Sequence, residues 1–166
     1  MSYVFKLMKS PVGTLTLVAK SSKLCAILWE NDKPDRVRLG PLHEDTHSPV
    51  LLEAERQLNQ YFAGERDCFE LELDFVGTDF QQKVWHALLT IPFGETRSYS
   101  QIAQQIGNPK AVRAVGAANG KNPISIVAPC HRVIGASGSL TGFAGGLGVK
   151  EFLLTLEGKE TLQLAF

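Results

Sequence analysis

The fold is decided by the stretch SYSQIAQQIGNPKAVRAVGAANG, residues 98–120. Ser98 and Gln101 have the spacing of a capping box, in which two side chains satisfy the first backbone N–H groups of a helix. This helix is expected to end at Gly107, because glycine favours the position just after a helix C-terminus. An Asn-Pro pair then favours the start of a second helix. Two capped helices joined by so short a turn predict a helix-turn-helix.

The second helix of the pair is expected over 110–119, with Asn108 as its N-cap. Its surface from Ala111 to Ala118 is nearly bare, because Arg113 is the one long side chain there. One interpretation is a small-residue face packed closely against a neighbouring helix. The other is a helix that enters the DNA minor groove, which is only about 6 Å wide, with one cationic side chain reaching inward. The helix alone leaves both open.

The residues that could do chemistry follow this helix pair. Residues 124–127 are predicted to form a short buried strand that leads into the run APCHRVIG. A lone cysteine is more often an inert buried residue than a reactive one. Near Cys130, however, the sequence places His131, Arg132 and Lys121. Positive charge stabilises a thiolate, which is the nucleophilic form of cysteine, so a reactive thiolate is expected.

Two more helices are expected on either side of these motifs. Thr78 and Gln81 repeat the capping-box pattern, and an apolar stripe follows from Phe80 through Val84, Leu88 and Ile91. The last helix has apolar positions at Val149, Phe152, Leu153 and Leu156. Glu157 falls at the end of that helix, where its carboxylate could point toward the Cys130 loop.

The first half of the chain predicts a small α/β lobe. Alternating apolar residues bounded by turn residues indicate strands over 3–8, 15–20, 24–29 and 69–75, the first three as an antiparallel meander. Ser48 is a good N-cap, and the helix that it starts should end at Gly64. Residues 30–48 show no sustained period, so they are interpreted as a surface loop.

Together these patterns predict an α+β fold in two units. Residues 1–76 are expected to form an N-terminal α/β lobe, an antiparallel sheet plus a helix. Residues 77–166 are expected to form a mostly helical, winged helix-turn-helix-like domain. With 166 residues, the chain is long enough for one full core or for two small lobes packed together.

Charge is balanced over the whole chain but not along it. Lys+Arg and Asp+Glu are both 17, which argues against a protein that binds nucleic acid through bulk charge. Residues 1–76 carry 9 basic and 12 acidic side chains, whereas residues 77–166 carry 8 basic and 5 acidic ones. The segment 95–132 has one acidic residue, Glu95, against Arg97, Lys110, Arg113, Lys121 and Arg132. An anionic partner is therefore expected at the second half.

The sequence favours a cytoplasmic protein with reduced thiols. No apolar run is long enough to cross a bilayer, and the opening residues do not form a signal peptide. The three cysteines, Cys25, Cys68 and Cys130, cannot all pair within one chain and are too far apart for a metal knuckle. Cys25 with His43 and His47 is too sparse a set to predict zinc, so no metal is expected.

The run PCHRV, residues 129–133, resembles the active-site signature of the O6-alkylguanine-DNA alkyltransferase family, also called methylated-DNA–protein-cysteine methyltransferases. Other short motifs occur where the family pattern would place them: Ser98-Tyr99, Gly107-Asn108-Pro109, Ala114-Val115-Gly116, Asn122-Pro123, Gly145-Gly146, Lys150-Glu151 and Glu157-Gly158. The resemblance covers essentially residues 77–158. The first 76 residues match loosely, as a lobe of strands plus a helix.

The resemblance implies direct reversal of DNA damage, in which an alkyl group moves irreversibly, once per molecule, from guanine O6 in double-stranded DNA to Cys130. It implies a chain of Glu157, His131, a water and the cysteine, in which His131 takes the thiol proton. Tyr99 would help to turn the nucleotide and then face O6, although a core aromatic is the structural alternative. Asn122 would be the hinge before the cysteine loop, or an ordinary turn residue. No cofactor and a monomer are expected, and O4-alkylthymine stays open as a second substrate.

The resemblance also implies a DNA surface and a substrate pocket. The small-residue helix would lie in the minor groove, and Arg113 would fill the gap left when the damaged nucleotide rotates out. The implied DNA contacts are Lys110, Ala111, Arg113, Ala114, Gly116, Lys121 and Tyr99, and the implied pocket residues are Pro129, Val133, Phe143, Ala144, Gly145 and Gly146. Phe143-Ala144 stand where some members have Tyr-Ser, which removes two hydroxyls and leaves the preferred alkyl size open.

Three other functions compete with this one. A non-catalytic binder of alkylated DNA would be similar in sequence, but those relatives lack the cysteine. A winged-helix regulator would read base edges in the major groove, for which a helix almost without hydrogen-bonding side chains is poorly suited. A cysteine hydrolase could also use a Cys, His and Glu trio, and turnover of an ester would support it.

Overall fold

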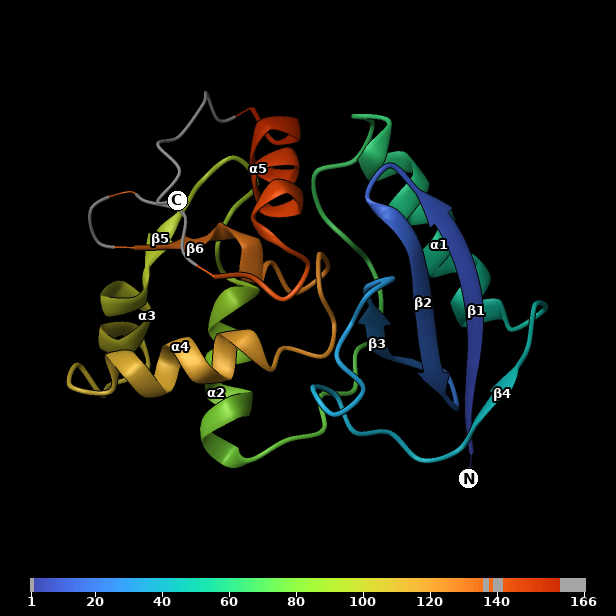
Figure 1. The fold of residues 1–166 in the computed structure, drawn as a ribbon, viewed down its shortest axis with the longest axis horizontal. Helices are drawn as coiled ribbons and strands as arrows, with labels where there is room; N and C mark the ends of the chain where they lie inside the picture. The colour runs from blue at the N-terminus through green and yellow to red at the C-terminus, as the bar shows by residue number, and fades with distance from the viewer. Residues whose placement is uncertain (1, 136–137, 139–141, 159–166) are drawn as a thin grey trace.

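The computed structural model describes residues 2–135, 138 and 142–158. Figure 1 shows two groups of elements side by side, a sheet with one helix and a cluster of helices. Buried apolar side chains from both groups form one continuous core, so the two lobes are packed firmly against each other. In the described part of the chain, no helix is both long and apolar enough to cross a bilayer.

The N-terminal lobe is built on a four-stranded sheet of order β3-β2-β1-β4. Its strands are β1 (Tyr3–Ser10), β2 (Gly13–Lys20), β3 (Lys23–Leu28) and β4 (Leu42–Glu44). The three strands of the expected meander are confirmed, and they pair antiparallel. Leu15, Leu17 and Ala19 alternate along β2 on the face that is buried in the core.

The fourth strand is a correction to the expected surface loop over 30–48. β4 lies within that stretch and pairs in parallel with β1, which makes the sheet mixed rather than antiparallel. All three of its side chains are exposed. Because an exposed edge strand needs no apolar alternation, the sequence pattern carried no sign of it.

The expected strand over 69–75 is wrong in form. Its side chains do alternate in exposure, but the segment makes a single bridge to β3, between Leu73 and Leu24. The reason is competition for the edge of β3, because Ile27 on the same strand is bridged to Ile124 of the other lobe. The alternation therefore predicted which side chains are covered, and the tertiary fold decided that no regular strand forms.

Helix α1 (Pro49–Phe62) covers one face of the sheet, as Figure 1 shows. Ser48 accepts a hydrogen bond from the Leu51 N–H, which confirms the expected N-cap. Leu51, Leu58 and Tyr61 lie on the buried side of this helix. Tyr61 belongs to its last turn, which brings a residue of the first lobe to the boundary with the second.

In the described part of the second lobe, helices surround a short parallel pair of strands. They are α2 (Asp79–Leu88), α3 (Tyr99–Gln105), α4 (Val112–Gly120) and α5 (Leu147–Leu156), with β5 (Arg97–Ser98) paired to β6 (Val133–Ile134). Both expected capping boxes, at Thr78 and Ser98, are complete. Helices α2, α3 and α4 pack on one another, and α3 with α4 forms the helix-turn-helix.

Helix α4 begins later than expected. Asn108 is not its N-cap, because the Asn108 carbonyl instead accepts a hydrogen bond from the Ala111 N–H at 3.0 Å and closes a turn. The first bond of the helix runs from the Val115 N–H to the Ala111 carbonyl, and Ala111 caps it without a side-chain hydrogen bond. The turn between the two helices is therefore longer than the sequence predicted.

The expected strand over 124–127 is a tight turn instead. The Val127 N–H donates to the Ser125 carbonyl at 2.8 Å, across Ile126, which has a positive φ of 73°. A β-branched residue in this conformation is strained and is held there by its surroundings. The segment is buried as predicted, but the Val127 N–H bonds within the turn and the Ile124 N–H bonds to the Asn122 side chain. The turn leads directly into the Cys130 segment.

Candidate active site

Cys130 begins a one-turn 3-10 helix, η1 (Cys130–Arg132), which packs against α2 and α5. Its side chain is 4% exposed. The side-chain amide of Asn119, at the end of α4, donates to the Cys130 carbonyl at 3.4 Å. The sulfur therefore lies in the protein interior. The Asn119 bond connects the backbone of Cys130 to the last turn of α4, the second helix of the helix-turn-helix.

Asn122 fixes the turn that leads to the cysteine. Its side chain is fully buried, donates to the Ala128 carbonyl at 2.8 Å and accepts from the Ile124 N–H at 3.1 Å. These two bonds tie the residues before Cys130 to the segment that leaves α4. The Asn122 side chain is therefore more constrained than that of an exposed turn residue, and its role as a hinge stays a prediction.

The carboxylate of Glu157, the C-cap of α5, is the centre of a buried polar cluster. Its Oε2 lies 2.7 Å from Nε2 of His131. Arg132 donates from Nε to Oε1 at 2.7 Å and from Nη2 to Oε2 at 3.0 Å, and its third nitrogen donates to the Ile91 carbonyl at 2.7 Å. His131 and Glu157 thus come together as predicted, and Arg132 joins them.

These contacts set the protonation of the cluster. Burial alone would raise the pKa of Glu157, but the hydrogen bonds from His131 and Arg132 lower it to about 2. Burial lowers the pKa of His131, and this outweighs the opposing effect of Glu157. Glu157 is therefore an anion, compensated by Arg132, beside a neutral imidazole. With Nε2 directed at Glu157, the buried Nδ1 has no hydrogen-bond partner among the described residues and could accept a proton.

The predicted resting thiolate is wrong. Burial raises the pKa of the Cys130 thiol, and the nearby groups that favour the anion do not offset this. Those groups are also different from the expected ones, since they are Asn122, Arg36, Lys150 and Ser125. The Arg132 guanidinium is used by Glu157, so it belongs to the buried cluster and not to the surface patch. A base is consequently required to activate this sulfur.

Residues 142–150 form a wall beside the turn that leads to Cys130. Lys150 is fully buried, and its Nζ donates to the Val133 carbonyl at 2.6 Å. Burial lowers the pKa of Lys150 to about 8. Its Nζ also lies 5.8 Å from the centroid of the Phe143 ring, which meets the Trp29 ring edge-on. A Cβ on Gly145 would come within 2.9 Å of Trp29, so only glycine allows this approach.

The remaining predicted pocket residues lie in the same region. Pro129 and Val133 are buried on either side of η1, whereas Ala144 and Gly146 are exposed. Gly146 has a positive φ of 94° and is the N-cap of α5. The buried turn adjoins Cys130 directly, whereas the glycine-rich wall is linked to it through the contact of Phe143 with Lys150, whose charge acts on the Cys130 thiol.

Helix α4 has one packed side and one open side. Val115, Ala118 and Asn119 are buried against α2 and α3. The other side exposes Arg113, Ala114, Ala117 and Gly120, and Arg113 has no hydrogen bond or ion pair with the described residues. The small-residue face is therefore not packed on a neighbouring helix of the described chain. Ala111 and Gly116 are half-buried at its edge, and Lys110 and Lys121 are exposed at its two ends.

Tyr99 stands at the start of α3, half-buried, beside this open side. A Cβ on Gly116 would lie 3.8 Å from the Tyr99 ring, so the two residues are neighbours in ordinary contact. The hydroxyl-bearing ring and the small-residue helix thus share one surface. Tyr99 is not enclosed as a core aromatic would be.

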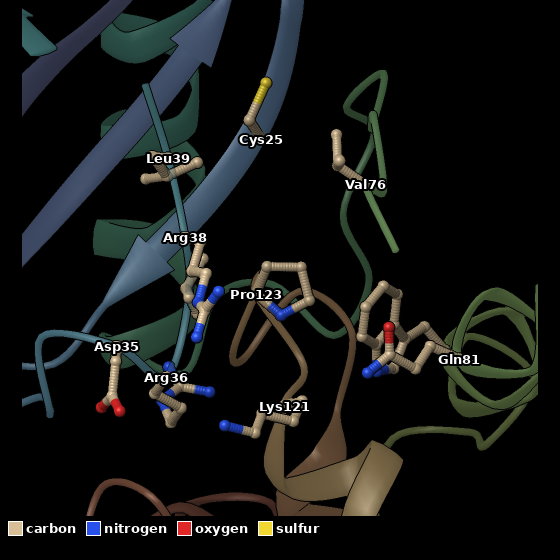
Figure 2. A pocket seen from close by; sticks show the side chains of 11 residues that line it. Cys25, Asp35, Arg36, Arg38, Leu39, Val76, Gln81, Lys121 and Pro123 are labelled. Atoms are coloured by element: carbon tan, nitrogen blue, oxygen red, sulfur yellow. The ribbon is translucent and has the colours of Figure 1, made fainter. Parts of the chain in front are cut away.

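A hollow of about 390 Å³ lies between the two lobes, beside Lys121. Figure 2 shows Arg36, Arg38 and Lys121 gathered around it, with Cys25 and Val76 at its other end. Arg36 is paired with Asp32, and one of its nitrogens donates to the carbonyls of Asn122 at 2.8 Å and Gly120 at 3.1 Å. Through Arg36, the first lobe is therefore hydrogen-bonded to the segment between α4 and the turn that leads to Cys130.

Two family models match the chain and between them cover most of it. The "6-O-methylguanine DNA methyltransferase, DNA binding domain" matches residues 79–159, and the "6-O-methylguanine DNA methyltransferase, ribonuclease-like domain" matches residues 3–75. The chain belongs to the 6-O-methylguanine DNA methyltransferase family. Its first 76 residues, which the sequence related only loosely to the family, are thus included in the match.

Other methyltransferases of this family are similar over nearly their whole length. The methylated-DNA–protein-cysteine methyltransferase of Mycobacterium tuberculosis is 54% identical over 155 residues, 92% of this chain and 91% of the relative. That of Methanosarcina acetivorans is 49% identical over 154 residues, 93% and 97% of the two chains. The crystal structure of Mycobacterium tuberculosis OGT in complex with DNA superposes with a TM-score of 0.86 at 52% identity, covering 93% and 92%.

In this methyltransferase, several residues of the site were not foreseen from the sequence. Tyr61 bonds to Glu157, Lys150 bonds to the Val133 carbonyl just after η1, and Arg36 bonds to the segment between α4 and the Cys130 turn. A lysine on the apolar side of a helix signals a buried cation in need of a partner, and this signal was available for Lys150. Tyr61 and Arg36 gave no such signal, because each makes its contact with a residue about 90 positions away.

Proposed function

We propose that this protein repairs DNA by direct reversal, moving an alkyl group from O6 of guanine onto its own Cys130. Similar proteins are named methylated-DNA–protein-cysteine methyltransferases, and a similar solved structure is a complex with DNA. The observation that carries the proposal is the buried Glu157–His131 pair immediately beside Cys130 in the chain. This pair supplies a neutral, oriented base where a thiol of raised pKa needs one.

His131 is the general base of the proposed reaction. The thiol proton of Cys130 passes to Nδ1 of His131, through a water in the scheme that the family resemblance implies. Glu157 keeps its negative charge because its pKa is about 2, so it stabilises the imidazolium that forms without taking the proton. Arg132 keeps the Glu157 carboxylate in place through two hydrogen bonds.

The new thiolate attacks the alkyl carbon on O6. A sulfur–carbon bond forms, the carbon–O6 bond breaks, and its electron pair stays on the guanine. The guanine then takes up a proton, for which Tyr99 is the proposed donor. The product at Cys130 is a thioether, and the described site has no second thiol positioned to cleave it. The protein therefore reacts once.

DNA binding is assigned to the open side of α4. Its small side chains suit the minor groove, and Arg113 would enter the duplex where the damaged nucleotide has rotated out. Extrusion costs a few kcal/mol, and less for a base whose pairing is already weakened, which favours damaged guanine. Exposed Lys110 and Lys121 would contact phosphates at the two ends of the helix.

Three finer points belong to the same proposal. We place the boundary between the two lobes at 76/77, which is supported by the bridge at Leu73 before it and the helix cap at Thr78 after it. We place the protein in the cytoplasm, because a reducing compartment keeps the reactive thiol free. We expect one chain to act alone, since the residues assigned to the chemistry all belong to the same chain.

Incubation with O6-benzylguanine followed by an intact mass measurement tests the proposal. We expect one benzyl increment per chain, mapped to Cys130 by peptide analysis, and none in Cys130→Ser. Cys25→Ser and Cys68→Ser are matched controls, which lose a free thiol elsewhere and should react like the wild type. An unmodified Cys130 in folded protein would leave only a binder of alkylated DNA or a regulator. Turnover of an ester substrate would point to a hydrolase instead.

A further inference from the structure

Tyr61, in the last turn of α1, reaches out of the N-terminal lobe into the charged cluster of the other lobe. Its hydroxyl donates to Oε2 of Glu157 at 2.6 Å. We propose that Tyr61 is a positioning residue of the alkyl-transfer site, holding the Glu157 carboxylate and tuning the basicity of His131. This inference rests on the proposed function, because it assigns a role relative to the same proton transfer.

The Tyr61 ring is fixed by its packing. It is 1% exposed and lies among three aromatic rings, with centroids 5.4 Å away for Phe62, 5.5 Å for Phe69 and 6.4 Å for Phe93. A ring confined on three sides leaves its hydroxyl little freedom of direction. The hydrogen bond to Glu157 is thus set by the packing of the first lobe and not by a mobile side chain.

The Tyr61 bond completes the set of donors around Glu157. Oε2 receives Tyr61 at 2.6 Å, His131 at 2.7 Å and Arg132 at 3.0 Å, and Oε1 receives the second Arg132 bond at 2.7 Å. A carboxylate offers about four acceptor positions. Four donors meet this one carboxylate, three at Oε2 and one at Oε1, so its orientation is fixed from several directions while the proton moves.

Tyr61 remains a donor throughout the reaction. Burial and the charge of Glu157 raise the pKa of the phenol far above its ordinary value, so it does not ionise. It shares Oε2 with His131, and each donor reduces the negative charge available to the other. Without the phenol, Oε2 would stabilise the imidazolium more strongly, and the pKa of His131 would rise.

The charged and titratable groups that act on this cluster come from three elements. η1 contributes His131 and Arg132, α5 contributes Lys150 and Glu157, and α1 contributes Tyr61. Arg132 and Lys150 are cations that lower the pKa of His131, and Glu157 raises it. Tyr61 stays neutral throughout the reaction, so removal of its hydroxyl changes a hydrogen bond without changing the net charge.

Tyr61→Phe tests the inference, because it removes one oxygen and keeps the aromatic packing. Rate constants for benzyl transfer from O6-benzylguanine would be measured by intact mass between pH 5 and pH 9. The acid side of the profile, where His131 must be neutral, should move up by about 0.5 to 1 pH unit. This means a rate about 3- to 10-fold lower on that limb, approaching the wild-type rate at high pH. Tyr3→Phe, in β1, is the matched control and should leave the profile unchanged.

Two results would overturn the inference. A Tyr61→Phe profile that superposes on the wild type would mean that the hydroxyl plays no part. A loss of rate by the same factor at every pH, with a lowered melting temperature, would mean that Tyr61 acts only in packing. Failure of the proposed function would look different, because the wild type itself would then acquire no benzyl group at Cys130.

Discussion

Helix α4 and the η1 cluster belong to one lobe but differ in how their polar groups are satisfied. The open side of α4 carries Arg113 without a partner among the described residues and is otherwise covered by alanine and glycine. In the η1 cluster, His131, Arg132 and Glu157 are all buried and joined by hydrogen bonds of 2.7 to 3.0 Å. The bare surface of α4 leaves its interactions for a ligand, whereas the η1 cluster has satisfied its charged groups within the protein and leaves Nδ1 of His131 without a partner among the described residues.

Because of this difference, substitutions in the η1 cluster and on the open side of α4 should have different effects. A change in the η1 cluster should affect the chemistry and the free energy of unfolding together, because a buried charge would lose its partner. Replacing Arg113 on the open side of α4 should affect reaction with duplex DNA alone, because its side chain makes no hydrogen bond or ion pair with the described part of the chain. Four predictions follow from this contrast.

Glu157→Gln should have the largest effect. It leaves the Arg132 guanidinium buried without its counter-ion, which costs about 3 to 5 kcal/mol of unfolding free energy. Loss of the oriented base should also slow benzyl transfer by about 100-fold or more. Urea unfolding and intact mass would measure the two. Glu151→Gln, on the same helix, should stay within about 0.5 kcal/mol of the wild type. A Glu157→Gln variant that lost rate but kept full stability would contradict the expectation that the cluster serves both chemistry and stability.

The same cluster should make stability depend on acid pH. The pKa of Glu157 is lowered from 4.5 to about 2. As the pH falls, the carboxylate is therefore protonated at a lower pH in the folded state than in the unfolded state. This stabilisation is complete above about pH 4.5 and is lost as the pH falls toward about 2, a total of about 3 kcal/mol. The difference in unfolding free energy between wild type and Glu157→Gln should therefore shrink over this range. A constant difference would contradict the assignment.

Arg113→Ala probes the other side of the comparison. If Arg113 replaces the extruded nucleotide, repair of a duplex containing O6-methylguanine should slow by about 10- to 100-fold, since extrusion costs a few kcal/mol. Reaction with free O6-benzylguanine and the unfolding free energy should be unchanged. Arg56→Ala on α1 removes an exposed arginine far from α4 and serves as the control. Equal losses on duplex and free base would rule out the role of Arg113.

Lys110→Gln should give the smallest effect. One lost phosphate contact should reduce the slope of log affinity against log salt by about 0.9 and weaken duplex binding a few-fold at moderate salt. Fluorescence anisotropy over a salt series would measure both. Benzyl transfer from the free base should not change. An unaltered salt slope would mean that Lys110 does not contact the backbone.

Local signals in the sequence predicted much of the architecture. The capping boxes at Thr78 and Ser98 depend on residues three apart, so they hold in almost any fold that contains the helix. The run around Cys130 predicted the chemistry for a similar reason, since Cys130 and His131 are adjacent. The stretch 69–75 shows the limit, because its alternation was real but another segment had taken the strand edge that it needed.

The electrostatics could not be predicted in the same way. Arg132 was expected to favour the thiolate because it is two residues from Cys130, but its guanidinium is turned to Glu157 and Ile91. The cations that do favour the anion, Arg36 and Lys150, come from distant parts of the chain. Sequence neighbours in a turn often point in different directions, so proximity along the chain does not fix the field at an atom.

By itself, the sequence determined the helix-turn-helix, the adjacent Cys-His pair and the bare helix with its single arginine, because each depends on short-range pattern and residue type. Only the tertiary structure decided that the thiol is buried and needs a base, that Arg132 serves Glu157, and that Tyr61 of the first lobe completes the cluster. These facts depend on which groups exclude water together, and that is settled when the two lobes pack into one core.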